Sequence, residues 1–504
     1  MPDATAIRRV AALVAAGLAV RVLSAAVVAQ PGYTDAYYYA NVASRLARGL
    51  GLTADFVWNP IELGPLPVVS HRFWMPLATV VQAAGIALFG PLIGDFRAAQ
   101  LAIIAVVAFV PAATYAAARS VGATERASLV AGAVVALGGV FAPAWVSVDG
   151  FAPAALLGTL FFLLYARAAR GSVRSGALAG VAVGLLYLTR TEGALFGLAL
   201  VLLTLRTRSR ASGLVGSLVA VAIGGAWLAR NVAAGLPSDL LARTVLLTRY
   251  DEFFSLRGIT TDVFSAPIGD VLAVRTAAVA TNTVVFIFAF GLVLAVPLVW
   301  GVRALWSHGA VRAWAILALV VFVAQSLFWT LHSTRGSYFH SLAAFFPFGV
   351  AIALAGGERL LASRPREVAA GWASGTLVLF AVISFAAVWQ WDSVFNDGAN
   401  ARAAVVDAIP AGSFLAIDAA AWRWISGRSV IVTPSDGLDA AMCAWSFADP
   451  HPTSLVLEQT HFRAYDALYD GGPRPAWLGA PIERGTVKIF PVIAPPDLVC
   501  AIRR

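Results

Sequence analysis

One carboxylate lies among four tyrosines in a short polar stretch, YTDAYYY at residues 33–39, directly after the first apolar segment. An acidic side chain is costly at a membrane boundary and is often functional there. Tyrosine is common at the same boundary. We predict that Asp35 is catalytic and that Tyr37 belongs to the same site. The alternatives are that Asp35 only caps a helix beginning near Ala36 and that the tyrosines form an aromatic belt.

Further ionisable side chains occur in every segment that we expect to face outward. They are Arg72, Asp149, Arg190, Glu192, Arg249, Tyr250, Arg335 and His340. Carboxylates serve as general bases or as ligands of divalent metals, and the guanidinium fork grips phosphate oxygens. The mixture predicts a cavity at the outer interface, and a substrate that joins a phosphate, a lipid and a polar group would suit it.

Each of these groups has a purely structural alternative. Asp149 could cap the helix that follows it, and Arg190 could form a local ion pair with Glu192. Long basic side chains such as Arg72 and Arg335 can reach lipid headgroups instead of a substrate.

His340 could likewise pair with lipid. Because His332 and His340 are eight residues apart, their spacing disfavours a two-histidine metal site on one helix. No phosphate-binding loop, dinucleotide fingerprint or serine nucleophile elbow stands out.

The elements that must position these residues are membrane helices. The chain has 504 residues, of which 60% are hydrophobic and 12% charged, whereas soluble domains carry about 25% charged residues. Apolar runs of about 20 residues recur, each long enough to cross a bilayer. The first run, residues 7–29, has no persuasive cleavage site, so we expect a retained helix and not a signal peptide.

Hydropathy predicts about eleven spans in a polytopic α-helical membrane protein. A polar and aromatic loop at about 30–75 follows the first span, and a short apolar segment at about 76–90 predicts an interfacial helix. The further spans are expected near 97–118, 127–146, 151–170, 176–189, 192–207, 214–232, 278–300, 313–332, 338–357 and 369–391.

The net charge of +9 does not indicate nucleic-acid binding. From residue 392 onward there are 9 Lys and Arg against 12 Asp and Glu, so the excess of positive charge belongs to the membrane part. Its arginines gather in alternate loops, as the positive-inside rule requires. We predict a protein of the cytoplasmic membrane with a cytoplasmic N-terminus and an extracytoplasmic C-terminus.

Residues 392–504 are predicted to form a soluble extracytoplasmic α/β domain, separate from a membrane module of residues 1–391. Short apolar runs at 429–432 and 454–457 alternate with turn-forming segments at 434–437 and 449–452, a pattern typical of strands joined by turns.

The two cysteines of the chain, Cys443 and Cys500, both lie in this region. They form either a disulfide or two buried thiols. Trp422, Trp424 and Trp445 could stack on sugars, although core packing is the better-founded role. The domain could recognise an acceptor, brace the first loop or bind a partner.

The membrane part resembles the GT-C superfamily of glycosyltransferases, near the protein O-mannosyltransferase and lipid A aminoarabinose transferase group. Asp35 matches the acidic residue of the first outer loop, and Asp149 matches an acidic residue of the second. RFWMPL at 72–77 is similar to a basic-then-proline motif that opens an interfacial helix, although this chain has Met-Pro-Leu where the group has Pro-Pro-Leu. LTRTEG at 188–193 and WLARN at 227–231 are similar to boundary segments of bacterial members.

The resemblance implies transfer of a hexose or pentose from a polyprenyl-phosphate-linked donor to a hydroxyl of a glycan, lipid or protein. Asp35 would be the general base, and Arg72, Arg190 or Arg335 would bind the donor phosphate. Inversion at the anomeric carbon is expected. The resemblance leaves open a divalent metal held by Asp35 and Asp149, because members of the superfamily differ in metal use.

Two other functions remain open at this point. A transporter or flippase of polar lipids would need ionisable groups near the bilayer midplane and internal repeats, and the sequence shows these groups at one surface without an evident repeat. A non-catalytic scaffold for envelope assembly would tolerate the loss of Asp35.

Overall fold

The computed structural model describes residues 4–236, 249–258, 266–493 and 500. The chain separates into two compact units, and each is described by itself. Unit 1 comprises residues 1–29, 72–241 and 273–392, and unit 2 comprises residues 30–71, 242–272 and 393–504. The first outer loop, which we grouped with the membrane part, thus packs with the C-terminal residues as far as residue 71.

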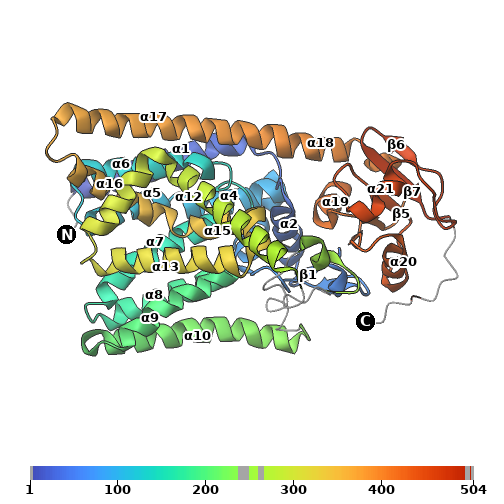
Figure 1. The fold of residues 1–504 in the computed structure, drawn as a ribbon, viewed down its shortest axis with the longest axis horizontal. Coiled ribbons are helices and arrows are strands. Elements are labelled where there is room, and N and C mark those ends of the chain that lie inside the picture. The colour runs from blue at the N-terminus through green and yellow to red at the C-terminus, as the bar shows by residue number, and fades with distance from the viewer. Residues whose placement is uncertain (1–3, 237–248, 259–265, 494–499, 501–504) are drawn as a thin grey trace. The chain divides into compact units, whose positions relative to one another are not determined.

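Unit 1 is built from helices (Figure 1). They are α1 (Ala4–Val27), α3 (Leu77–Ile93), α4 (Asp95–Val107), α5 (Val110–Ser120), α6 (Glu125–Leu137), α7 (Phe151–Ala168), α8 (Val173–Thr189), α9 (Gly197–Thr204), α10 (Arg210–Ala233), most of α12 (Ile268–Ala304), α13 (Gly309–Leu327), α14 (Thr330–His332), α15 (Tyr338–Ala343), α16 (Phe346–Leu360) and α17 (Arg366–Trp391). The helix α3 occupies the place of the predicted interfacial helix.

Seven helical segments of the described chain are long and apolar enough to cross a membrane. They are Ala4–Val27, Asp95–Ser120, Phe151–Ala168, Thr207–Ala233, Ile268–Ala304, Gly309–Leu327 and Arg366–Ala408. A pair bent by 68°, Thr330–Ala343 with Phe346–Leu360, would make an eighth. The protein is an integral membrane protein, as predicted. The number of about eleven spans stays a prediction, because α3, α8 and residues 191–204 are apolar but shorter.

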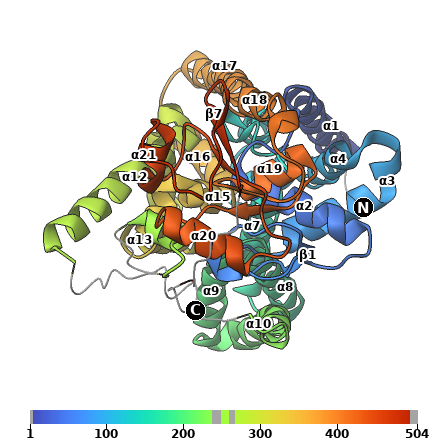
Figure 2. The same ribbon diagram turned by 90° about the vertical axis from the view of Figure 1, so that its right-hand side faces the viewer.

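Small residues let the helices of unit 1 approach closely. A Cβ atom added to Gly180 of α8 would lie 2.2 Å from the carbonyl oxygen of Gly216 in α10, and these two helices run side by side in Figures 1 and 2. A Cβ atom added to Gly158 of α7 would lie 2.0 Å from the oxygen of Ala344. Lipid tails are as apolar as the helix surfaces, so the hydrophobic effect does not drive helices together within a membrane. Close backbone contact of this kind is therefore a main source of helix association.

Unit 2 contains a five-stranded sheet in the order β4-β3-β5-β7-β6. The strands are β3 (Phe414–Ala416), β4 (Val430–Val432), β5 (Ser454–Leu457), β6 (Ile482–Arg484) and β7 (Val487–Pro491). The strand β3 pairs in parallel with β4 and β5, and β7 pairs antiparallel with β5 and β6. The α/β character predicted for the C-terminal region is confirmed, with strands at both of the expected apolar runs.

The other helices of unit 2 are short. They are α2 (Thr34–Ala47), α18 (Asp397–Ala403), α19 (Ala419–Ser426), α20 (Leu438–Phe447) and α21 (Asp466–Tyr469). Two further strands, β1 (Thr53–Ala54) and β2 (Val68–Val69), pair antiparallel in a two-stranded ribbon.

The first outer loop is joined to the sheet through its backbone. The nitrogen of Val57 donates to the oxygen of Val430 at 2.9 Å, and the nitrogen of Val432 donates back to the oxygen of Val57 at 2.9 Å. Because β4 is the last strand on its side of the sheet, the loop covers an edge that would otherwise offer unpaired backbone groups. This pairing explains why residues 30–71 belong with the C-terminal residues.

Cys443 and Cys500 form a disulfide with a Cα–Cα distance of 5.2 Å, so the first of the two alternatives is confirmed. Trp422 is buried beside Phe414 in the core of unit 2, and the ring of Trp445 stacks on His451 at 4.3 Å.

Candidate functional site

The segment that carries Asp149 is held in place by an arginine of the first helix. Residues 138–150 follow α6, whose C-cap residue Gly138 has a φ of 93°, and the next residue, Gly139, also has a positive φ, 57°. Arg21, only 1% exposed, donates to the carbonyl oxygens of Ala136, Leu137 and Ala142. Its guanidinium lies 5.0 Å from the ring centroid of Trp145. Arg21 therefore faces the interior of the helix bundle.

Asp149 is 1% exposed and meets a histidine from a distant part of unit 1. Its Oδ2 lies 2.9 Å from Nε2 of His340, and its Oδ1 accepts from the backbone nitrogen of Gly150. Because Gly150 is the N-cap of α7, Asp149 precedes the cap position, and the capping alternative is wrong.

The hydrogen bonds of His340 determine which of its ring nitrogens carries a hydrogen and what can lie between the ring and Asp149. Nδ1 lies 2.9 Å from the carbonyl oxygen of Gly336, and since a carbonyl only accepts, Nδ1 must carry the hydrogen. Nε2 therefore faces the Asp149 carboxylate with either a proton or a cation between them. A metal-binding histidine commonly anchors its other nitrogen on a backbone carbonyl in this way.

A break in a membrane helix brings His340 to this position. Residues 333–337 form a single wide π-turn before α15, and Gly336 has a φ of 108°. Such turns are frequent at functional sites. Arg335 is exposed on the same turn.

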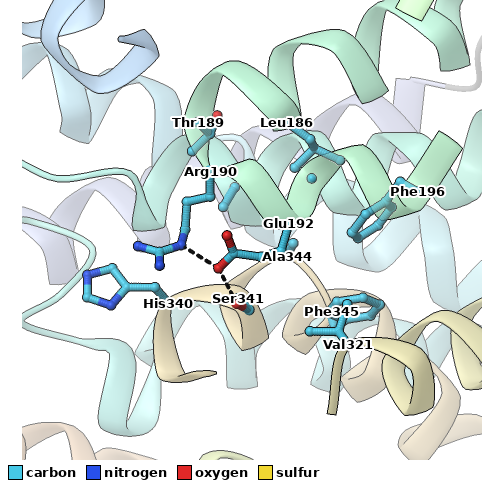
Figure 3. Close-up of a pocket in the computed structure, with 12 residues that line it drawn as sticks. Leu186, Thr189, Arg190, Glu192, Phe196, Val321, His340, Ser341, Ala344 and Phe345 are labelled. Carbon is cyan, nitrogen blue, oxygen red and sulfur yellow. Dashed lines mark hydrogen bonds and ion pairs between the residues drawn. The ribbon is translucent and has the colours of Figure 1, made fainter. Parts of the chain in front are cut away.

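A second cluster surrounds the ion pair of Arg190 and Glu192 (Figure 3). Nε of Arg190 lies 2.8 Å from Oε1 of Glu192, and Nη2 donates to Oγ of Ser337 at 2.8 Å. Glu192 also accepts from Ser341 at 2.5 Å and from Gln325 at 3.2 Å. The local ion pair is thus present, and it is tied to the turn and helix that carry His340.

A small cavity of about 20 Å³ adjoins both clusters, with room for about one water molecule. Arg190, Glu192, His340 and Ser341 line it together with apolar side chains. Figure 3 shows these four residues facing one another from two segments of the chain.

Unit 1 therefore brings together four of the predicted site residues, Asp149, Arg190, Glu192 and His340. Arg72, half-buried, lies in the turn before α3.

Sequence reasoning missed the side chains that connect the clusters, Gln325, Ser337 and Ser341. Gln325 donates to Glu192 and to both serines. A usable signal was present, because Gln325 is a polar residue inside the apolar span predicted at 313–332, and polar groups within membrane helices are commonly functional.

In unit 2, Asp35 is the second residue of α2, whose N-cap position is Tyr33. Asp35 therefore does not cap the helix, contrary to the structural alternative. Tyr37 is fully buried and donates to Oε1 of Gln30 at 3.3 Å. Burial raises the pKa of the Tyr37 hydroxyl, so it remains a hydrogen-bond donor at physiological pH. Because Tyr38 and Tyr39 are also at most 2% exposed, this run is part of the protein interior and not an aromatic belt.

Arg249 and Tyr250 also belong to unit 2. Arg249 is exposed at the N-cap of a short 3-10 helix, residues 250–254, and the ring of Tyr250 lies 5.7 Å from that of Phe254. Nδ2 of Asn59 donates to the oxygen of Phe253 at 2.8 Å, which fastens this helix to the first loop.

No family model and no curated protein matches the chain. Solved structures do match it. The structure of ArnT from Cupriavidus metallidurans bound to undecaprenyl phosphate is 16% identical with a TM-score of 0.59, and the match covers 97% of this chain and 98% of that one. The apo state of the same protein matches with 15% identity, a TM-score of 0.58 and the same coverage.

The archaeal oligosaccharyltransferase AglB from Archaeoglobus fulgidus, in complex with an inhibitory peptide and a dolichol-phosphate, is 14% identical with a TM-score of 0.54. That match covers 90% of this chain and 69% of the other. At these identities the likeness shows the fold, and it confirms the GT-C fold that the sequence predicted.

Proposed function

We propose that the protein is a membrane glycosyltransferase that moves a sugar from a polyprenyl-phosphate-linked donor to an acceptor hydroxyl. The observation that carries the proposal is the cluster of buried ionisable groups, Asp149 with His340 and Arg190 with Glu192, in a chain with this fold. The likeness to ArnT extends over nearly the whole of both chains, and that protein was solved bound to undecaprenyl phosphate. This likeness supports a lipid-linked donor.

Asp35 is the proposed general base. Its place in the first turn of α2 favours the ionised carboxylate, because the N-terminus of a helix carries partial positive charge. The carboxylate takes the proton of the acceptor hydroxyl while that oxygen forms a bond to the anomeric carbon. The bond from this carbon to the phosphate oxygen breaks, and its electron pair leaves with polyprenyl phosphate. A single displacement inverts the anomeric carbon, and phosphate needs no strong general acid.

The proposed phosphate-binding residues are Arg72, Arg190 and Arg335. For Arg190 the structure offers a reason for precise recognition, since Glu192 and Ser337 hold two edges of the guanidinium and so fix its plane. A fixed planar fork binds phosphate oxygens in a defined orientation. Tyr37, Glu192, Arg249, Tyr250 and His340 remain site candidates.

A divalent metal is part of the proposal, and Asp35 and Asp149 remain its predicted ligands. The tautomer of His340 leaves Nε2 suited to metal ligation. A structure of the Archaeoglobus fulgidus oligosaccharyltransferase with Zn and sulfate, 12% identical over 89% of this chain with a TM-score of 0.51, supports this choice. A metal there would add positive charge beside the donor phosphate.

We place the reaction on the outer face of the cytoplasmic membrane, with an extracytoplasmic C-terminal region and an acceptor hydroxyl on a glycan, lipid or protein. The arginines of alternate loops support this orientation. The disulfide between Cys443 and Cys500 supports it as well, because structural disulfides are typical of oxidising compartments.

The test uses purified protein in liposomes with polyprenyl-phosphate-linked sugars labelled in the sugar. A glycosyltransferase moves the label from the lipid donor to the acceptor and releases polyprenyl phosphate. A flippase carries the donor across the bilayer intact, and a scaffold leaves both unchanged. Glu367→Gln, which changes an exposed carboxylate in the first turn of α17, is the matched control and should transfer like the wild type. Label that stays on its lipid with the wild-type protein would overturn the proposal.

A further inference from the structure

The first turn of α2 is attached to a buried ionic cluster from the C-terminal part of unit 2. Thr34, the residue before Asp35, donates its hydroxyl hydrogen to the carboxylate of Asp418. Asp418 in turn caps α19, where its Oδ1 accepts from the nitrogen of Ala421. One carboxylate thus touches the N-terminal turns of two helices.

Arg402 of α18 organises this cluster. Its Nε lies 2.7 Å from Oε1 of Glu458, and its Nη1 lies 3.4 Å from Oδ2 of Asp418. Trp422 donates its indole hydrogen to Oε2 of Glu458 at 2.9 Å. The three charged side chains are at most 17% exposed, so water competes little for their hydrogen bonds.

Tyr37 ties the next turn of α2 to the residues that precede α18. Its hydroxyl donates to Gln30, and Nε2 of Gln30 donates to the oxygen of Asn396 at 3.3 Å. One turn further along, Nδ2 of Asn41 donates to the oxygen of Ala420 at 2.9 Å. Figures 1 and 2 show α2 and α19 side by side.

The cluster is better suited to fixing geometry than to stabilising the fold. Burial raises the pKa of Asp418 although Arg402 opposes the shift, so the ionised carboxylate is held at a cost. Buried ionic groups are weak evidence for stability and are most useful when they define one arrangement. A catalytic side chain needs such definition, within about 0.5 Å.

We propose that Arg402, Asp418 and Glu458 are positioning residues that fix the first turn of α2 and thereby orient the carboxylate of Asp35. The inference rests on the proposed role of Asp35 as general base. It assigns a function to the C-terminal region, which braces the helix that carries the base.

The sharpest variants lie at the contact between Thr34 and Asp418. Thr34→Val removes the hydroxyl with little change of shape, and Thr34→Ser keeps it. Asp418→Asn removes the charge and retains a side-chain oxygen that can cap α19. Glu483→Gln is the matched control, because its ion pair with Lys488 at 3.0 Å joins two strands of the same unit.

Two measurements on the full-length protein in detergent test the proposal. The first is hydrogen exchange of the α2 backbone amides, and the second is kcat and KM for sugar transfer from the polyprenyl-phosphate sugars of host membranes. Thr34→Val and Asp418→Asn should each raise amide exchange and lower kcat about tenfold with KM unchanged, as expected for loss of a hydrogen bond to a charged group. Thr34→Ser should recover most of the rate, and Glu483→Gln should resemble the wild type. In an Asp35→Asn background, Thr34→Val should lower the residual rate no further.

The outcomes separate the two levels of the argument. If Asp35→Asn transfers at the wild-type rate, the proposed function of Asp35 fails, and this inference fails with it. If Asp35→Asn is inactive while Thr34→Val and Asp418→Asn keep the wild-type kcat, only the positioning role is overturned. Faster exchange in α2 without a fall in kcat overturns it as well.

Discussion

Removing the charge of Glu192 should destabilise unit 1 strongly, because this carboxylate is the centre of a buried network. It accepts from Arg190 at 2.8 Å, from Ser341 at 2.5 Å and from Gln325 at 3.2 Å. The side chains of Arg190 and Glu192 are 17% and 13% exposed. Glu192→Gln keeps the shape of the side chain but leaves the guanidinium of Arg190 without its counter-charge.

The expected loss follows from the burial of the pair. Removing one partner of a buried ion pair costs about 3–5 kcal/mol, much of it from the charge left behind. Because both side chains keep some exposure and glutamine keeps one acceptor, we expect the lower end, about 3 kcal/mol. Arg190→Gln should cost a similar amount. The double variant should cost less than the sum by about 2 kcal/mol, since neither charge then remains unpaired.

The assay is reversible unfolding in mixed micelles with increasing SDS, followed by tryptophan fluorescence. Glu367→Gln, exposed and in the same unit, should change the unfolding free energy by no more than about 0.5 kcal/mol. If Glu192→Gln lowers the unfolding free energy by no more than about 0.5 kcal/mol, Arg190 and Glu192 do not form a buried ion pair. If the losses of the two single variants add up in the double variant, the two side chains are not coupled.

Three further predictions concern other parts of the chain. Asp149→Asn and His340→Gln should each lower sugar transfer at least about 100-fold while the protein stays folded, and wild-type rates for both would remove the pair from the site. Burial alone would raise the pKa of Asp55, but Arg423 and Arg45 outweigh it and hold this pKa below its usual value. The stability from these contacts is therefore full above about pH 4 and lost as the pH falls through the lower folded pKa. Acid unfolding curves should flatten in Asp55→Asn, and an unchanged curve would contradict this. Cys443→Ser with Cys500→Ser opens a loop of 57 residues and should lower the unfolding free energy by about 2–4 kcal/mol, whereas an unchanged value would show that the bridge constrains little.

Local patterns in the sequence predicted local structure well. The apolar runs at 429–432 and 454–457 contain β4 and β5. The ion pair of Arg190 with Glu192, which the sequence offered only as an alternative to a site role, is present. The helix expected near 76–90 is present as α3. In each case the residues concerned are neighbours along the chain, and periodicity or spacing reports them directly.

Contacts across long separations could not be predicted in this way. Asp149 and His340 are 191 residues apart, and their meeting depends on the broken helix before α15. The hydrogen bond that attaches α2 to α19 joins Asn41 to Ala420, 379 residues apart. Neither hydropathy nor spacing encodes which turn of one helix faces which strand. The number of spans is difficult for a related reason, because breaks such as that between α15 and α16 interrupt a run that reads as one apolar segment.

The most direct test of the central claim compares the wild-type protein with Asp35→Asn in transfer of labelled sugar from a polyprenyl-phosphate donor. The asparagine keeps the size and hydrogen-bonding oxygen of the side chain but cannot take a proton. We predict that the variant folds normally and that its kcat falls by about 100- to 10,000-fold, the range expected for loss of a general base. Equal rates for the two proteins would contradict the account.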